Sequence, residues 1–251
     1  MFGLRTYWLT TLRYALGPRV FRTTALGDHR FVVGSHVEFF RTVRFGGELE
    51  PLAALMFLVR PDDVVWDVGA SVGLYTVHLA PLVRRVIAFE PDPATAARLR
   101  ENVELNGLTG TTDIVAVALG DHDGEVELST SGLSGNAPAI SNLGRHQGTT
   151  MVPVSRADTL VSTGRIAAPT VIKMDVEGAE GLVLKGAADL LRSSSAPRLL
   201  FVEVHPQFLP RYGDVDASRI QADLRAMNYL VIASRRREEQ FHLLAARHAA
   251  P

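Results

Sequence analysis

Short apolar runs alternate with segments of helical periodicity along most of this chain. The apolar runs end at charged or glycine-bearing turns and predict strands over 64–66, 85–89, 113–119, 170–174 and 198–204. The segments between and after them predict helices over 48–59, 74–82, 93–105, 178–191 and 216–227. Because parallel strands need crossover connections of this length, the alternation predicts an α/β fold, a mainly parallel sheet with helices on both faces.

Hairpin patterns stand at both ends of this alternating region. Residues 20–26 and 30–34 flank Gly27-Asp28, a turn sequence typical of hairpins. Residues 229–233 and 240–245 flank a charged turn and predict a second, antiparallel hairpin near the C-terminus. These pairs lie outside the strand–helix alternation and therefore add antiparallel strands to the predicted fold.

Two segments fit neither pattern. Residues 2–16 place apolar side chains at helical spacing and predict an amphipathic helix, either packed across the main domain or covering a substrate or membrane surface. Residues 129–150 are rich in Ser, Gly and Asn and predict a loop too long for a simple connection, which could cover a ligand. Residues 125–128 are a further strand candidate beside 113–119.

Composition narrows the classes of protein that fit. A chain of 251 residues with 47% hydrophobic and 21% charged residues is long enough for one sizeable domain, which we expect over 48–251 after an N-terminal appendage over 1–47. The longest apolar run, 52–59, is far shorter than the roughly 20 residues that span a bilayer. Because cysteine is absent and no leader pattern is visible, we expect a soluble, cytoplasmic protein without disulfides or cysteine-based metal sites.

Charge is divided unevenly along the chain. The net charge of −1 is the sum of +5 over residues 1–47, from seven Arg against Asp28 and Glu38, and −6 over the remainder. An acidic main domain does not favour phosphate backbones, so we expect no nucleic-acid partner. Only two of the 26 basic residues are lysines, Lys173 and Lys185, so a lysine at a strand end stands out.

The clearest candidate for ligand binding is the segment 64–73, where a hydrophobic strand runs into a turn that contains Gly69 and Gly73. Glycines let a ligand approach the backbone, although they could also serve only strand–helix packing. Asp67 stands before the turn, and its carboxylate would repel a dinucleotide pyrophosphate but suits the cationic methionine part of S-adenosylmethionine. The glycine spacing also differs from the Gly-x-Gly-x-x-Gly of NAD enzymes, which makes an NAD-dependent oxidoreductase the weaker alternative.

Two further acids extend the nucleotide hypothesis. Glu90 ends the next strand in Phe89-Glu90-Pro91, where a carboxylate can accept hydrogen bonds from both ribose hydroxyls. Asp121 follows the third strand after a glycine and could meet the adenine edge, although the same residues form an ordinary turn sequence.

Charged residues alternate with apolar ones at the ends of two buried strands. Lys173 and Asp175 end one strand, and Glu203 and His205 end the other. Because this fold binds its ligands at the carboxyl ends of the strands, we expect all four to face one cleft. The alternative is that they form ion pairs with only a structural role, while Glu177 and Glu180 stabilise the start of the next helix. We expect this structural role for Glu180.

These four residues suggest acid–base chemistry. On intrinsic pKa, His205 is the better general base, and Asp175 would orient the hydroxyl or the base, with Lys173 and Glu203 in support. A divalent-metal site of Asp175, Glu203 and His205 is a rival arrangement, which the ligand types permit and the spacing does not demand. We therefore expect no metal.

Several of these segments together resemble one family. They are Val65-Trp-Asp-Val-Gly-Ala-Ser-Val-Gly73, Phe89-Glu-Pro91, Ile172-Lys-Met-Asp-Val-Glu-Gly-Ala-Glu180 and Phe201-Val-Glu-Val-His205, with weaker likeness at 47–51 and 156–160. On these motifs, which cover about residues 45 to 233, the sequence resembles the FkbM-type methyltransferase family. The resemblance implies a Rossmann-like class I methyltransferase fold, with a seven-stranded sheet and a C-terminal antiparallel hairpin, and S-adenosyl-L-methionine as cofactor.

The resemblance also completes a set of functional residues. With the residues argued above, the expected cofactor-binding set is Glu50, Asp67, Gly69, Ala70, Ser71, Gly73, Glu90, Pro91 and Asp121. The activity it implies is O-methylation of a small hydroxylated acceptor, such as a sugar or a polyketide-like natural product. Methylation of a protein or nucleic acid is the alternative, and the enzyme could be a homo-oligomer.

Overall fold

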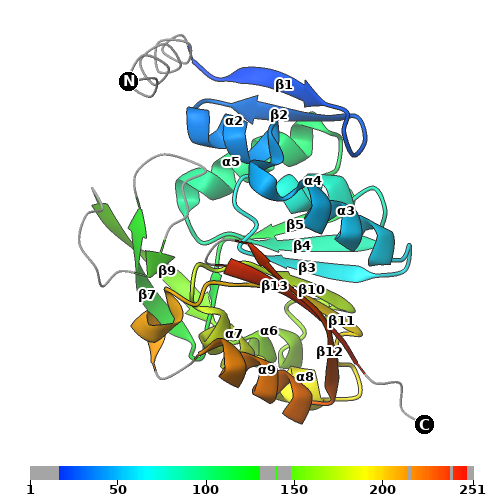
Figure 1. Ribbon diagram of the computed structural model, residues 1–251. Helices are drawn as coiled ribbons and strands as arrows, with labels where there is room; N and C mark the ends of the chain where they lie inside the picture. The colour runs from blue at the N-terminus through cyan, green and yellow to red at the C-terminus, as the bar shows by residue number, and fades with distance from the viewer. Residues whose placement is uncertain (1–16, 131–138, 141–147, 214–215, 238–239, 248–251) are drawn as a thin grey trace.

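The computed structural model describes residues 17–130, 139–140, 148–213, 216–237 and 240–247 (Figure 1). The helix predicted over 2–16 and most of the loop predicted over 129–150 lie outside the described residues. Among the residues that are described, no helix is both long and apolar enough to cross a membrane.

A seven-stranded sheet forms the centre of the molecule, as predicted. Its order is β12 (Tyr229–Arg237), β13 (Gln240–Arg247), β11 (Leu199–Val204), β10 (Val171–Met174), β3 (Val64–Val68), β4 (Arg85–Phe89) and β5 (Thr112–Val115). The five strands from β11 to β5 run parallel, whereas β13 is antiparallel to both β11 and β12. The C-terminal hairpin therefore joins the main sheet at one edge.

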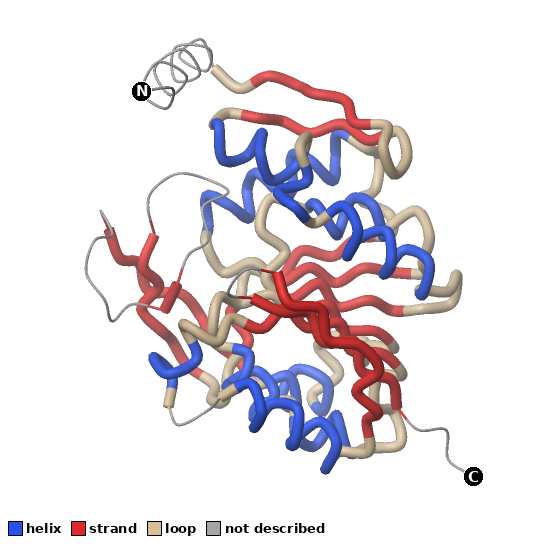
Figure 2. The backbone as a smooth tube through the Cα atoms, in the orientation of Figure 1, coloured by secondary structure: helices blue, strands red, loops and turns tan. Residues whose placement is uncertain are grey.

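Helices cover both faces of this sheet (Figures 1 and 2). On one side lie α2 (His36–Thr42), α3 (Leu49–Leu58), α4 (Leu74–Leu79) and α5 (Pro93–Leu105), with the short η1 (Phe45–Gly47). On the other lie α6 (Ala157–Ser162), α7 (Glu180–Gly186), α8 (Ala188–Arg192) and α9 (Ala217–Ala226), and η2 (Leu209–Tyr212) follows β11. Successive side chains of β3 point to opposite faces of the sheet, so Trp66 packs in the buried apolar cluster on one face and Val65 in the cluster on the other.

The N-terminal hairpin is confirmed as β1 (Arg19–Thr23) and β2 (His29–Val33), paired antiparallel. Phe31 of β2 is buried in the same apolar cluster as Val65 of β3. A side-chain amide ties the hairpin to the main domain, because Asn102 of α5 accepts from the amide of Val32 and donates to the carbonyl of Val72. The boundary at residues 47 and 48 stays a prediction.

The segment predicted as one strand over 113–119 is two strands. β5 ends at Val115, whose carbonyl accepts from the amide of Glu90, and β6 (Ala118–Leu119) belongs to a separate sheet with the order β6, β9, β7, β8. The pairing predicted for 125–128 is wrong, because β7 (Gly124–Thr130) pairs with β9 (Gly148–Ser155) and β8 (Ala139–Ile140). The predicted helix over 178–191 is also divided, between α7 and α8.

Candidate active site

Two adjoining cavities open at the carboxyl ends of the parallel strands. The first, of about 680 Å³, lies beside β4 and β6 and has mostly apolar walls, with Val68, Phe89, Val117 and Leu119 among them. The second, of about 800 Å³, lies between α4 and β11 and is lined by charged side chains. Both volumes include space open to solvent. The residues lining both are Arg41, Gly69, Ser71, Asp175 and Glu177. Two compartments with a shared wall suit a reaction between two bound molecules.

The glycine turn after β3 is shaped by its neighbours. Gly69 has a φ of 77°, and a Cβ there would lie 1.8 Å from the carbonyl oxygen of Asp175. Gly73 has a φ of 96°, and a Cβ there would lie 2.6 Å from Leu99 Cδ1. Gly69, Ala70 and Ser71 line the second cavity, whereas Gly73 is absent from the described lining of either one. Gly73 packs closely against Leu99, the role that the sequence had left as an alternative, and its contact with the cofactor stays a prediction.

Glu90 lies at the end of β4 in the wall of the first cavity, next to Pro91. Its two carboxylate oxygens accept from the amides of Ser71 and Asp92, both at 2.9 Å. Burial raises the pKa of Glu90 to about 7, since only 2% of the residue is exposed and the two amides offset this only in part. Each oxygen keeps a lone pair for a further donor.

Three predicted cofactor residues lie elsewhere. Asp67 is fully buried beneath the turn, where it accepts from Thr76 Oγ1 at 2.6 Å, and it is absent from the described lining of both cavities. Asp121 accepts from Lys185 Nζ at 2.8 Å outside the cavities. Glu50 is exposed in the first turn of α3, and Glu48 lines the second cavity in its place. For these three acids the geometry gives no support to direct cofactor contact.

Lys173 is the partner of Asp67. Its Nζ lies 3.3 Å from Asp67 Oδ1 and 3.9 Å from Asp175 Oδ2, and it donates to the carbonyl of Gly69 at 3.3 Å. Burial opposes its charge, but the carboxylates of Asp67, Asp175 and Glu203 outweigh burial and raise the pKa of Lys173. This ammonium therefore stays charged and links the glycine turn to the acidic wall of the second cavity.

The side chain of His205 is surrounded by carboxylates. Its Nδ1 lies 2.9 Å from Glu180 Oε1, and its Nε2 lies 3.8 Å from Asp175 Oδ1 and 3.7 Å from Glu177 Oε2. Burial favours the neutral ring, but these three acids prevail and raise the pKa of His205 to about 9. At neutral pH His205 is thus a cation, and a cation cannot accept a proton.

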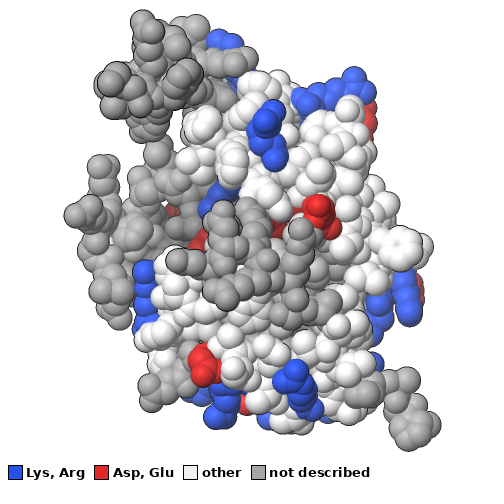
Figure 3. All heavy atoms as spheres, in the orientation of Figure 1, with Lys and Arg blue, Asp and Glu red and all other residues white. Residues whose placement is uncertain are grey.

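Glu177 faces both cavities and was not predicted as a site residue. Burial and the nearby carboxylate of Asp175 raise its pKa to about 7, although His205 and Arg41 act in the opposite direction. Its φ of 53° is strained for a residue with a side chain. On the space-filling surface, acidic atoms gather near the middle of one face (Figure 3).

Comparison with known proteins identifies the family. A profile described as the FkbM methyltransferase domain matches residues 67–231. This chain belongs to that family. It is 31% identical over 182 residues to the hexuronic acid methyltransferase AglP of Haloferax volcanii, with 72% of each chain covered. It is 30% identical over 231 residues to the 31-O-demethyl-FK506 methyltransferase FkbM of Streptomyces tacrolimicus, with 76% of this chain and 83% of that protein covered.

A solved structure shares the fold of this FkbM-family methyltransferase. Trm5b from Pyrococcus abyssi aligns with a TM-score of 0.51 at 14% identity, over 91% of this chain and 54% of that one. A likeness at this identity shows the Rossmann-like fold alone. Family membership makes the chain a methyltransferase that uses S-adenosylmethionine, and this excludes the NAD-dependent oxidoreductase alternative.

The FkbM-family site contains several residues that the sequence did not single out. They are Arg41, Glu48, Tyr75, Glu177 and His242. Glu48 and Glu177 lie within motifs that carry the family resemblance, and this position in the sequence is a signal that marks them as candidates. Arg41, Tyr75 and His242 carry no local signal, because they reach the site from α2, α4 and β13 only through the fold.

Proposed function

We propose that this enzyme transfers a methyl group from S-adenosylmethionine to a hydroxyl oxygen of a small molecule, such as a sugar or a polyketide-like natural product. One observation carries the proposal: Asp175 and Glu177 line both cavities, so a group bound in either one meets the same two carboxylates. Relatives named as methyltransferases of hexuronic acid and of a demethylated FK506 oxygen support an oxygen acceptor.

The first cavity fits the nucleoside part of the cofactor. Its walls are mostly apolar away from the side shared with the second cavity, and Glu90 lies among them with lone pairs that suit two ribose hydroxyls. Ser71 Oγ, at the shared wall, is buried and makes no hydrogen bond among the described residues. Gly69, Ala70 and Pro91 would complete the cradle. When bound, S-adenosylmethionine supplies a methyl group on a positively charged sulfur, which the acids of the second cavity would attract.

The second cavity would hold the acceptor and remove its proton. The sequence favoured His205 as the base, but a pKa of about 9 leaves it protonated at neutral pH. Glu177, with a pKa of about 7, is the better proton acceptor, because a base works best when its pKa is near the working pH. His205 then places the carboxylates of Asp175 and Glu177, to which its Nε2 points.

Lys173 and Glu203 keep supporting roles in this proposal. Lys173 would help to position the carboxylate of Asp175, since its ammonium lies 3.9 Å from Asp175 Oδ2. Glu203 lines the second cavity, where burial and the charge of Asp175 raise its pKa, and its carboxyl oxygens could bind acceptor hydroxyls. Alignment of the hydroxyl with the methyl group would supply most of the remaining rate enhancement.

Methyl transfer from labelled S-adenosylmethionine tests the proposal. The panel should contain free and glycosidic hexuronic acids, macrolide alcohols, the amine counterparts of the best acceptors, total RNA and a protein mixture. We expect label on a hydroxyl oxygen of a small molecule. Label on RNA or protein would favour the macromolecular alternative, and label only on amines would remove the need for a base.

Variants then test the base. Glu177→Gln should lower turnover by about 10² or more while the affinity for S-adenosylmethionine stays within a few fold. Glu104→Gln is the matched control, because Glu104 is an exposed acid at the end of α5, away from both cavities. Normal turnover of Glu177→Gln would contradict the assignment.

A further inference from the structure

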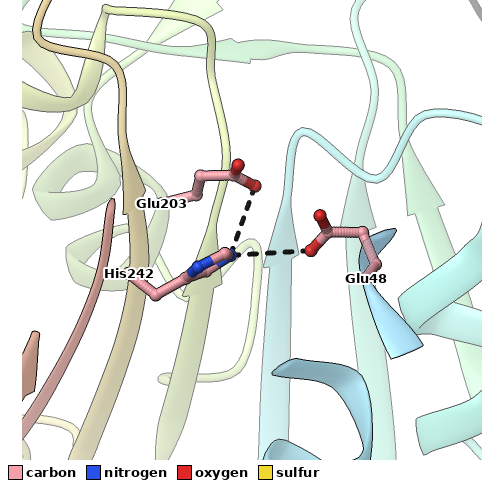
Figure 4. A group of neighbouring side chains, drawn as sticks. All are labelled: Glu48, Glu203 and His242. Carbon is pink, nitrogen blue, oxygen red and sulfur yellow. Dashed lines mark ion pairs between the residues drawn. The ribbon is translucent and has the colours of Figure 1, made fainter. Parts of the chain in front are cut away.

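Three side chains from separate elements converge at the wall of the second cavity. Glu48 precedes α3, Glu203 lies in β11, and His242 lies opposite Glu203 in the antiparallel register of β13. Figure 4 shows all three side chains pointing toward one another. His242 Nε2 is 3.6 Å from Glu48 Oε2 and 3.6 Å from Glu203 Oε2.

The imidazole nitrogen at the centre of this group makes no ordinary hydrogen bond. His242 is 6% exposed, and its Nε2 has no hydrogen-bond partner among the described residues. A distance of 3.6 Å to each carboxylate oxygen is too long for a hydrogen bond. Burial lowers the pKa of His242, but the ion pairs with Glu203 and Glu48 outweigh burial and raise it to about 9, so a metal ion bound here would displace the proton of the ring.

The same distances suit a shared metal ion. Zinc lies about 2.0–2.2 Å from imidazole nitrogen and carboxylate oxygen, which puts neighbouring ligand atoms of a tetrahedral site about 3.3–3.6 Å apart. One ligand atom from each of Glu48, Glu203 and His242 lies within 4.8 Å of the other two. Tyr75 donates to Glu48 Oε2 at 2.9 Å and so holds one ligand in place, as outer partners do in metal sites.

We propose that Glu48, Glu203 and His242 bind a divalent transition-metal ion, with zinc or manganese as the class. Glu48 and Glu203 both line the second cavity, so the position left open by three protein ligands faces the space for the acceptor. A role for the ion in holding an acceptor oxygen rests on the proposed function; binding of the ion does not. The proposal revises the expectation of a metal-free site.

A second cluster competes for the ion through the shared Glu203. Asp175, Glu203 and His205 also place one ligand atom each within 4.8 Å of the others. There, however, the ammonium of Lys173 lies 3.9 Å from Asp175 Oδ2. A fixed cation next to a ligand opposes a second one, so the ion belongs with His242.

Calorimetric titration of the chelator-treated full-length chain with Zn²⁺ and with Mn²⁺ tests the site. We expect one ion per chain, and tenfold or greater weakening in both Glu48→Gln and His242→Asn. His205→Asn is the matched control and should keep the affinity within a few fold. Thermal melts of each variant, and the absorption spectrum of bound Co²⁺ as a report on the ligand set, separate loss of a ligand from loss of the fold.

Two results would overturn the proposal: no binding of either ion by the wild-type chain, or binding lost in His205→Asn and kept in His242→Asn. The readout is independent of methyl transfer. An enzyme that binds Zn²⁺ as expected but methylates no hydroxyl would contradict the proposed function and leave the metal site standing.

Discussion

Lys173→Met should destabilise the protein strongly, although Lys173 stands beside the reaction site. The substitution removes the ammonium 3.3 Å from Asp67 Oδ1 and leaves a fully buried carboxylate with Thr76 as its hydrogen-bond donor. Removing one partner of a buried ion pair typically costs about 3–5 kcal/mol. Because a domain is stable by only about 5–15 kcal/mol, this loss should be visible in any unfolding curve.

The double variant makes this prediction specific. Asp67→Asn removes the orphaned charge, so Asp67→Asn/Lys173→Met should be at least about 1 kcal/mol more stable than the sum of the two single losses implies. Guanidinium unfolding, followed by circular dichroism and by the fluorescence of the buried Trp66, measures all four proteins. A cost under about 1 kcal/mol for Lys173→Met, or strictly additive losses, would refute the reasoning.

Three further predictions concern binding and stability. The affinity for S-adenosylmethionine should rise as the pH rises through about 7, because Glu90 must be ionised to accept from both ribose hydroxyls. Measured by calorimetry, Glu90→Gln should bind S-adenosylmethionine about tenfold or more weakly, with an affinity that no longer depends on pH in this range. Gly69→Ala should fail to fold, since its Cβ would lie 1.8 Å from the carbonyl oxygen of Asp175, whereas Gly110→Ala, with nothing within 4 Å, should melt like the wild type. Asp63→Ala should lower the free energy of unfolding, measured with denaturant, by about 1.5–3 kcal/mol, because it removes the carboxylate that accepts hydrogen bonds from Arg198 and Thr170.

The hydrophobic pattern was sufficient for the main sheet and for both hairpins. The residues that define a strand such as β4 or a helix such as α5 are neighbours along the chain, so the spacing of their apolar side chains can be recognised in the sequence. β9 was missed because it begins in a Gly- and Thr-rich segment and because Pro153 stands between its buried Val152 and Val154. α2 was missed because seven residues are too few to establish a helical period.

The positions of the charged residues at the strand ends were predicted correctly, but their chemical roles were predicted only in part. Lys173, Asp175, Glu203 and His205 were predicted from alternation alone, and the structure brings all four to one cavity. Their charges could not be predicted, because a pKa depends on burial and on every neighbouring charge. His205 is a cation largely because Glu180, the first residue of α7, contacts its Nδ1, and this contact between a helix and the residue after β11 is formed only in the folded protein.

What the sequence by itself determined is the succession of the main-sheet strands along the chain, the glycine turn and the family, because each rests on residues close together along the chain. Only the tertiary structure decided that Asp67 pairs with Lys173 beneath the glycine turn, and that Glu48 and His242 meet Glu203. Those contacts join residues up to about two hundred positions apart, and the pairing register of a folded sheet is what brings them together.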